Sequence, residues 1–293
     1  MKRNITRRTF LGEMAFIAAG APAARAADSA GGMGAGWEKL PGISLGGLKV
    51  SRMILGSNPF FGFAHGNPQA SEDQMRQWYT NERIMAVMDE AAEHGVNAVW
   101  TPCYPHWIRL WNEYRDKGGK LKNWIGQPDS FDAMAEHISD CARNGGTAIC
   151  IQGECVDRAF AKQRYDLVRS WLELIKGFGL PAGIASHRPW THLVAEQQHL
   201  PTDFYHQCLY QPEDYGWECL DKAIATIRKL EKPVVAYKVL AAGRIKPEIA
   251  LPHVFKHLGR KDGICVGVFP KTNRRQISQN TALTGKLTPR SST

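Results

Sequence analysis

The stretch NERIMAVMDEAAEHGVNAVWT, residues 81–101, joins one helix pattern to one strand pattern, and repeats of this unit decide the fold. Its first part predicts an amphipathic helix that ends at Gly95, because apolar residues recur every three or four positions. The apolar face of this helix consists of Ile84, Val87, Met88 and Ala91. The run 96–101 that follows is short and apolar, which is typical of a buried strand.

Eight such alternations of strand and helix patterns follow one another from residue 50 onward. The predicted strands cover residues 50–57, 96–101, 123–127, 147–153, 181–187, 204–210, 233–240 and 263–269. Further helix patterns cover 129–145, with Asp129 or Ser130 as the N-cap, and 164–179. Parallel strands need helical crossovers, and a closed barrel leaves no exposed strand edge. We therefore expect an α/β fold, a (β/α)₈ TIM barrel, with a doubly wound open sheet as the alternative.

The N-terminus has the pattern of a cleaved export signal. Arg7 and Arg8 precede an apolar stretch that ends in an Ala-x-Ala motif, as in the twin-arginine signals of proteins that are exported already folded. We therefore expect a periplasmic or otherwise extracytoplasmic protein, with the twin-arginine machinery as a partner and any cofactor loaded before export. The predicted boundaries are 1–26 for the signal, 27–36 for a linker, 37–285 for the barrel and 286–293 for a disordered tail.

Charge and hydropathy exclude two classes of partner. The formal net charge is +9, and removal of residues 1–26 takes away five basic residues and one acidic residue, which leaves +5. No basic run with interleaved aromatic residues occurs, so we expect no nucleic-acid partner. No apolar run of about 18 residues remains after the signal, so we expect no membrane insertion of the mature chain.

Four segments, in chain order, resemble the aldo-keto reductases, the NADP-dependent barrel oxidoreductases. These segments are ISLGGLKVSRMILG (43–56), AEHGVNAVWT (92–101), PVVAYKVLAAGR (233–244) and VGVFPKTNRRQISQN (266–280). The first is similar to the opening β-hairpin and first strand of that family, and the last to its phosphate-binding segment. The resemblance implies an N-terminal β-hairpin before the barrel, NADP as the cofactor, and a carbonyl or sugar-like substrate.

Carried over position by position, the resemblance implies an NADP site. Tyr237 corresponds to the aromatic residue that stacks on the nicotinamide, and Gln207 to the residue that binds its carboxamide. The adenosine end would be held by Lys271 and Thr272 at the phosphate and by Gln276 and Asn280 near the ribose and adenine. Independently of the family, a cation beside a helix start is a general anion-binding arrangement.

The catalytic positions depart from the family pattern. Trp100 occupies the position of the family's Asp, Tyr104 falls one residue short of its Tyr, Gln127 stands near its Lys, and Gln152 replaces its His. A glutamine can donate a hydrogen bond to a carbonyl oxygen, but it cannot tune the acidity of a tyrosine as an ammonium group does. We therefore expect a non-standard oxidoreductase site that uses Tyr104 and Gln152, with His106 as a further candidate.

Other polar residues near the predicted strand ends suggest acid–base chemistry. Gln152 and Glu154 share one face of the strand pattern at 147–153, so we expect both at the barrel mouth, near His187. Cys103 and His106 are close enough in sequence to reach one ion, so a divalent metal is not excluded, but their spacing is not diagnostic and predicts no ligand set.

Lys238 lies in an apolar strand pattern, either as an ammonium group inside the barrel with a lowered pKa, suited to catalysis, or at the strand end. In a regular strand Tyr237 and Lys238 point to opposite faces, so we do not expect both at the centre of the site. Aromatic residues gather near predicted strand ends, where they serve either as platforms for sugars or flat cofactors or as packing between helices. These residues are Trp100, Tyr104, Trp107, Trp111, Trp190, Tyr210 and Tyr215.

Three functions remain open from the sequence. The first is an NADP-linked oxidoreductase acting on a carbonyl or sugar-like substrate. The second is a non-redox carbohydrate lyase, isomerase or hydrolase that uses Glu154 and His187, with His106 as a further acid–base group. The third is a non-catalytic sugar-binding barrel. The chain also resembles a set of barrel proteins with an Asn-Pro-Phe-x-Gly-x-x-His signature, here Asn58 to His65, and that likeness supplies no reaction.

Overall fold

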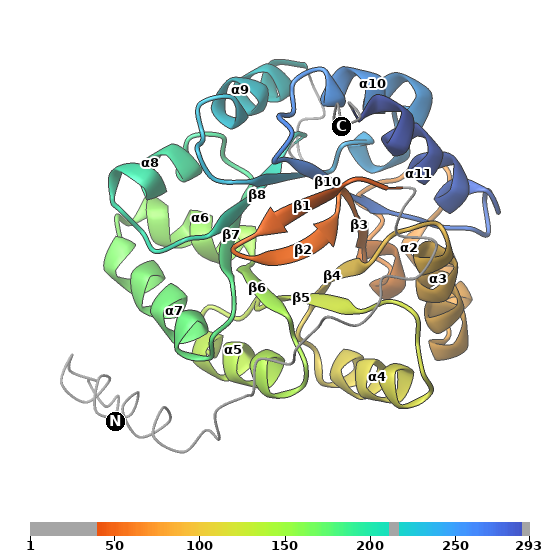
Figure 1. Ribbon diagram of the computed structural model, residues 1–293, viewed down its shortest axis with the longest axis horizontal. Helices are drawn as coiled ribbons and strands as arrows, with labels where there is room; N and C mark the ends of the chain where they lie inside the picture. Colours follow the sequence, from red (N-terminus) through yellow and green to blue (C-terminus); the bar gives the residue numbers. More distant parts are fainter. Residues whose placement is uncertain (1–39, 211–216, 289–293) are drawn as a thin grey trace.

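A closed barrel of eight parallel strands forms the centre of the molecule, ringed by helices (Figure 1). The structure is a computed structural model that describes residues 40–210 and 217–288. Around the barrel the strands follow the order β10-β3-β4-β5-β6-β7-β8-β9, which confirms the TIM barrel and excludes the open sheet. The strands are β3 (Met53–Gly56), β4 (Ala98–Pro102), β5 (Asn123–Gln127), β6 (Ala148–Ile151), β7 (Ala182–Ser186), β8 (Phe204–Cys208), β9 (Val234–Tyr237) and β10 (Gly263–Gly267).

The helices lie between the strands, as the sequence predicts. They are η2 (Asn58–Phe61), α2 (Glu72–Trp78), α3 (Asn81–Glu93), α4 (Pro105–Asp116), α5 (Met134–Arg143), α6 (Gly153–Ala161), α7 (Tyr165–Gly177), α8 (Thr191–Gln197), α9 (Trp217–Ile227), η3 (Ala241–Gly243), α10 (Pro247–Phe255) and α11 (Gln276–Leu287). Helix α5 begins later than expected, because Ser130 Oγ accepts a hydrogen bond from the backbone N–H of Ala133 in a turn that precedes the helix.

A two-stranded antiparallel hairpin, β1 (Gly42–Leu45) and β2 (Leu48–Ser51), lies across one end of the barrel (Figure 1). This confirms the hairpin expected from the sequence. Its apolar side chains Ile43, Leu45 and Val50 are buried in one cluster with the inward-facing residues of the strands. The tip of the hairpin lies beside Pro181 and Asp203, which precede β7 and β8. The hairpin therefore closes the N-terminal end of the barrel, and the opposite end is left for a site.

Alternate strand residues form two separate cores. One set points into the barrel, among them Trp100, Cys150, Tyr237 and Cys265. His206 belongs to the same set, since its ring contacts that of Trp100. The other set packs between the strands and the helices. Three buried tryptophans belong to this outer core, where Trp107, Trp111 and Trp124 contact one another with ring centroids 6.1 to 6.3 Å apart. These rings therefore pack helices and are not platforms at the barrel mouth.

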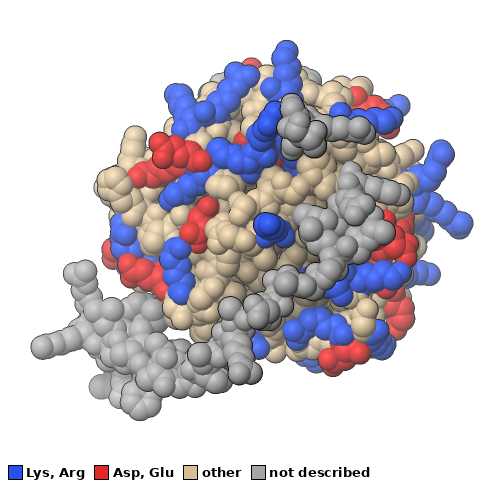
Figure 2. Space-filling model, in the orientation of Figure 1, with Lys and Arg blue, Asp and Glu red and all other residues tan. Residues whose placement is uncertain are grey.

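Some of the sequence expectations concern residues that the structure does not describe. The signal 1–26, the linker 27–36 and Tyr215 lie outside the described residues. Helix α11 continues to Leu287, two residues beyond the expected barrel boundary at 285. In the described part of the chain, no helix is long and apolar enough to cross a bilayer. Basic and acidic side chains are intermixed over the molecular face in Figure 2.

Candidate active site

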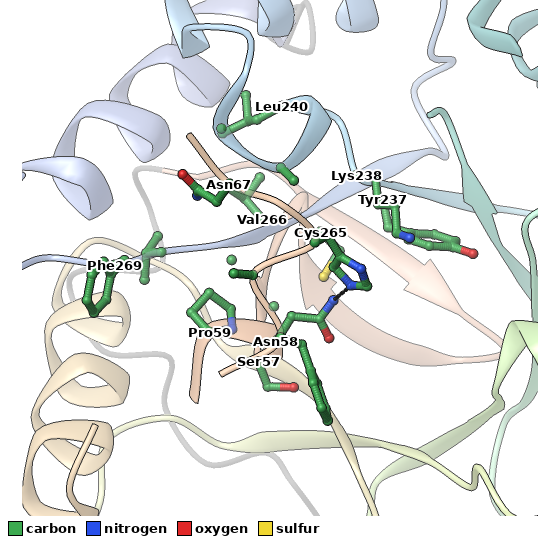
Figure 3. A pocket seen from close by; sticks show the side chains of 18 of the residues that line it. Ser57, Asn58, Pro59, Asn67, Tyr237, Lys238, Leu240, Cys265, Val266 and Phe269 are labelled. Carbon is green, nitrogen blue, oxygen red and sulfur yellow. Dashed lines mark hydrogen bonds between the residues drawn. The ribbon is translucent and has the colours of Figure 1, made fainter. Parts of the chain in front are cut away.

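A cavity of about 630 Å³ opens at the C-terminal end of the barrel. Its walls include residues from the ends of β3, β4, β5, β6, β7, β9 and β10 and from the first two turns of α11. Its volume is in the range of small-molecule sites, and this end of a TIM barrel is where enzyme active sites lie. Figure 3 shows part of this cavity, with Asn58, Tyr237 and Lys238 among its labelled residues.

Eight of the twelve residues expected at the site line this cavity. They are Tyr104, Gln152, His187, Tyr237, Lys238, Thr272, Gln276 and Asn280. The structure does not bring His106, Glu154, Gln207 or Lys271 into its lining. The cofactor residues at α11 and the polar residues at the strand ends therefore share one continuous space.

The polar group of Glu154, His187 and His106 expected from the sequence does not form. Strand β6 ends at Ile151 and α6 begins at Gly153, so the strand alternation does not extend to Glu154, which is exposed in the first turn of that helix. Gln152 is the N-cap of α6, where its Oε1 accepts a hydrogen bond from the backbone N–H of Cys155 at 3.0 Å. His106 is exposed at the start of α4 and stacks on Tyr104.

Gln207 and Lys271 also lie away from the cavity. The side chain of Gln207 is fully buried between the inward-facing positions His206 and Cys208, and its Nε2 donates to the Cys208 carbonyl at 2.9 Å. Lys271 is exposed at the surface. In contrast, Tyr237 and Lys238 both line the cavity. The strand ends at Tyr237, and Lys238 turns the chain with a left-handed φ of 56°.

A buried carboxylate orients His187 at the cavity wall. Asp157, from α6, accepts hydrogen bonds from the hydroxyls of Ser186 and Thr191 and from the backbone N–H of His187 at 2.9 Å. Its Oδ2 also lies 3.3 Å from Nδ1 of the His187 ring. This contact fixes the orientation of the ring and directs Nε2 away from the carboxylate. No pattern in the sequence singles out Asp157, which lies in an ordinary helix segment.

Tyr104 faces the cavity beside a second carboxylate. Burial, together with a hydrogen bond to Asp129, raises the pKa of the Tyr104 phenol well above its usual range. Oδ1 of Asp129 also lies 3.3 Å from Nδ1 of His137. Asp129 was expected as a helix cap, and the structure instead makes it a cavity residue. Tyr104 therefore stays protonated and acts as a hydrogen-bond donor rather than as an acid of lowered pKa.

His65 and Asn58 form a third polar group, from the loop after β3. Asn58 Nδ2 lies 3.0 Å from His65 Nε2 (dashed line in Figure 3). An amide nitrogen carries only hydrogens, so Nε2 accepts and the ring is neutral. In agreement, burial, followed by the charges of Lys238 and His187, lowers the pKa of His65 to about 4. Both residues belong to the Asn-Pro-Phe-x-Gly-x-x-His signature, for which the sequence predicts no role.

Backbone strain gathers around the same cavity. Among its lining residues, His65, Lys238 and Ala242 have positive φ values of 49°, 56° and 54°. Left-handed conformations of residues other than glycine cost on the order of 1–3 kcal/mol each and occur preferentially at functional sites. The strain therefore supports the assignment of this cavity as the functional site.

The described residues contain no group of three or more His, Cys, Asp or Glu side chains that could hold a metal ion. Cys103 and His106 do not converge, because the thiol is buried and the imidazole is exposed. Burial, with neighbouring Cys141, raises the pKa of Cys103 well above its usual range, and burial raises the pKa of Cys155 to about 12. Neither sulfur is a thiolate at neutral pH.

Comparison with known proteins supports the fold alone. No protein-family profile and no curated protein sequence matches the chain. Among solved structures, Gox0644 in its apo form has 12% identity over 86% of this chain and 95% of its own, with a TM-score of 0.54. A protein assigned as 2,5-diketo-D-gluconic acid reductase B has 12% identity over 84% and 86%, with a TM-score of 0.53.

A third match is the N-acetylneuraminic acid synthetase of Leptospira borgpetersenii serovar Hardjo-bovis. It has 13% identity over 85% of this chain and 89% of its own, with a TM-score of 0.50. The matching structures differ in activity while sharing the barrel, and one fold hosts many reactions. The chain is therefore a TIM barrel of the kind that enzymes use, and its function has to be argued from the site.

Proposed function

We propose that this barrel is an NADP-linked oxidoreductase of aldo-keto reductase type that acts on a carbonyl or sugar-like substrate with a non-standard active site. The observation that carries the proposal is the continuity of the cavity. Tyr237, the expected nicotinamide position, shares it with Thr272, Gln276 and Asn280, the expected adenosine positions, and with His187.

The part of the cavity expected to hold the adenosine fits NADP better than the part expected to hold the nicotinamide. Asn280 is 2% exposed and lines the cavity, and its Oδ1 has no hydrogen-bond donor among the described residues, so an adenine amino group would supply one. Exposed Lys271, Arg274 and Arg275 surround the start of α11, an arrangement suited to phosphate. Gln207 is buried elsewhere, so a different group has to hold the carboxamide.

Within this proposal, His187 takes the role of proton donor and acceptor. A bound dinucleotide would supply the hydride chemistry, and the His187 imidazole would give the matching proton to the substrate oxygen or take it up. Asp157 holds the ring by Nδ1, as a carboxylate does in other histidine-based sites. Tyr104 is less suited to this role because Asp129 and burial raise its pKa.

NADPH binding to the purified protein, measured by fluorescence titration, tests the proposal. We expect Asn280→Ala to weaken binding at least tenfold without lowering the melting temperature, because it removes a buried oxygen that has no protein partner. The exposed Asn81→Ala variant serves as the matched control and should bind as the wild type does. Failure of the wild-type protein to bind NADPH at millimolar concentration would overturn the proposal.

The Asp157–His187 pair favours one second candidate, a carbohydrate lyase or isomerase that works by proton transfer alone. Such chemistry needs no nicotinamide, and it no longer involves Glu154, which lies outside the cavity. His187→Gln should lower turnover by about 10²- to 10⁴-fold under either candidate. The two differ in cofactor dependence, so turnover of a panel of aldoses and ketoses with NADPH omitted would favour the second.

We further propose that the Arg7-Arg8 segment directs export of the folded holo-protein, since free NADP is scarce outside the cytoplasm. The proposal rests on the sequence of residues 1–26. Cell fractionation of the wild type and of a variant with Arg7→Lys and Arg8→Lys tests it. Export that persists unchanged in the variant would count against the twin-arginine route.

A further inference from the structure

Two buried thiols meet behind the wall of the cavity. Cys103 directly follows β4, and Cys141 lies on α5, the helix after the neighbouring strand β5. Cys103 is 2% exposed and Cys141 is fully buried. The interaction with Cys141 contributes to the raised pKa of the Cys103 thiol, as expected for neighbouring sulfurs. They come from segments 38 positions apart in the chain, so the barrel fold alone brings them together.

Gly126, on β5, shows how closely the two sulfur atoms approach. A methyl carbon built on this glycine would lie 2.0 Å from Sγ of Cys141 and 3.2 Å from Sγ of Cys103. The sulfur atoms are therefore separated by no more than the total of these two distances. Because Gly126 has no side chain, the two sulfur atoms occupy the space between β5 and α5.

We propose that Cys103 and Cys141 form a reversible disulfide that ties the end of β4 to α5 beside the cavity. Each thiol gives up its proton, one sulfur–sulfur bond forms, and two electrons pass to a disulfide oxidant such as oxidised glutathione, which is reduced to two thiols. The inference does not depend on the reaction proposed above.

The position of Cys103 lets disulfide formation affect the cavity wall. Tyr104 immediately follows Cys103 and lines the cavity, where its phenol contacts Asp129. Bond formation draws Cys103 toward α5, and the base of Tyr104 moves with it. The redox state of the pair is thereby transmitted to the cavity wall.

Burial sets the rate of the reaction. The pKa of Cys103 is raised, so little thiolate is present in the closed structure, and thiolate is the reactive species. Oxidation therefore proceeds slowly in the folded protein and faster when local opening admits solvent. Folded protein exported with reduced thiols would be oxidised on this slow timescale.

The test is a disulfide map of the full chain. Folded protein is incubated with oxidised glutathione, with and without 2 M urea to promote opening, then alkylated with N-ethylmaleimide under denaturing conditions and mapped by mass spectrometry. We expect a linked pair of peptides containing Cys103 and Cys141, faster formation in urea, and a higher melting temperature of the linked protein. Full alkylation of both cysteines under both conditions overturns the inference.

Cys150 and Cys265 are a second pair of cysteines that could form a disulfide instead. Both are buried in the barrel interior, and Cys265 contributes to the raised pKa of Cys150. A dominant link between these two would also overturn the inference. Cys265→Ser should leave the Cys103–Cys141 link intact, whereas Cys141→Ser should abolish every link to Cys103. A link from Cys103 to another cysteine in the Cys141→Ser variant would contradict the specific pairing.

Discussion

At the scale of single residues, Asp157 is the side chain on which the candidate site most depends. Its carboxylate accepts from the hydroxyls of Ser186 and Thr191 and from the backbone N–H of His187, and it contacts the His187 ring. A carboxylate offers only acceptors, so it suits several converging donors. An asparagine amide at this position would place its own N–H donors next to the donors that now bind the carboxylate.

We therefore predict that Asp157→Asn destabilises the protein by about 1–3 kcal/mol, because at least one buried donor loses its acceptor. Urea unfolding followed by circular dichroism measures the change. Asp116→Asn, at an exposed position near the end of α4, is the control and should change stability by less than about 0.5 kcal/mol. Equal stability of the two variants would show that Asp157 is not the anchor of this network.

At the scale of elements, the sequence predicts where strands lie better than which way their residues point. All eight strand positions were predicted, because buried parallel strands are continuous apolar runs. That same continuity hides which alternate set faces the barrel interior. It therefore offered no check on Gln207, which the family resemblance places at the cofactor and which points outward. Glu154 was misplaced because β6 ends earlier than its apolar pattern suggests.

The segment after β9 shows a second limit. Lys238, Ala241, Ala242 and Gly243 all have positive φ. The chain therefore turns at Lys238, inside the strand predicted over 233–240, and again just after that strand. Three of these four are residues that seldom adopt this conformation, so sequence patterns give no warning of it. This turn is what allows Tyr237 and Lys238 to line the same cavity.

We predict that Ala242→Gly stabilises the protein by roughly 0.5–1 kcal/mol. Alanine in the left-handed backbone conformation costs the folded protein about 1–2 kcal/mol, and glycine removes this cost. The greater conformational entropy of glycine in the unfolded chain offsets part of the gain. Ala86→Gly, at an exposed helical position of α3, is the matched control and should destabilise by about 1 kcal/mol. Urea unfolding of both variants gives the comparison, and equal losses in both would contradict strain at Ala242.

At the scale of the whole molecule, the barrel places two neutral histidines at its most buried positions. His206 on β8 points into the interior, edge-to-face with Trp100, with ring centroids 4.2 Å apart. His192 on α8 donates from Nε2 to the His206 carbonyl at 3.1 Å. Burial is the main cause that lowers the pKa of His192 to about 4 and that of His206 to about 3.

These depressed values couple the stability of the barrel to pH. Between the ordinary histidine pKa of 6.5 and the folded values, the unfolded chain binds protons that the folded chain does not. The contribution of these two histidines to the free energy of unfolding is therefore greatest above pH 6.5 and falls as the pH is lowered toward 4. From pH 7 to pH 5, each histidine accounts for a loss of roughly 2 kcal/mol.

His206→Phe isolates one of these two contributions. Both ring nitrogens of His206 lack hydrogen-bond partners among the described residues, so phenylalanine keeps the aromatic contact with Trp100 and removes the titrating group. We predict that this variant loses roughly 2 kcal/mol less than the wild type between pH 7 and pH 5. Urea unfolding at the two pH values measures the difference, with the exposed His199→Gln variant expected to behave as the wild type. The pH dependence of the unfolding free energy could instead be the same in His206→Phe as in the wild type. That result would mean that the His206 imidazole takes up a proton in the folded state, and the inference that burial keeps it neutral would be wrong.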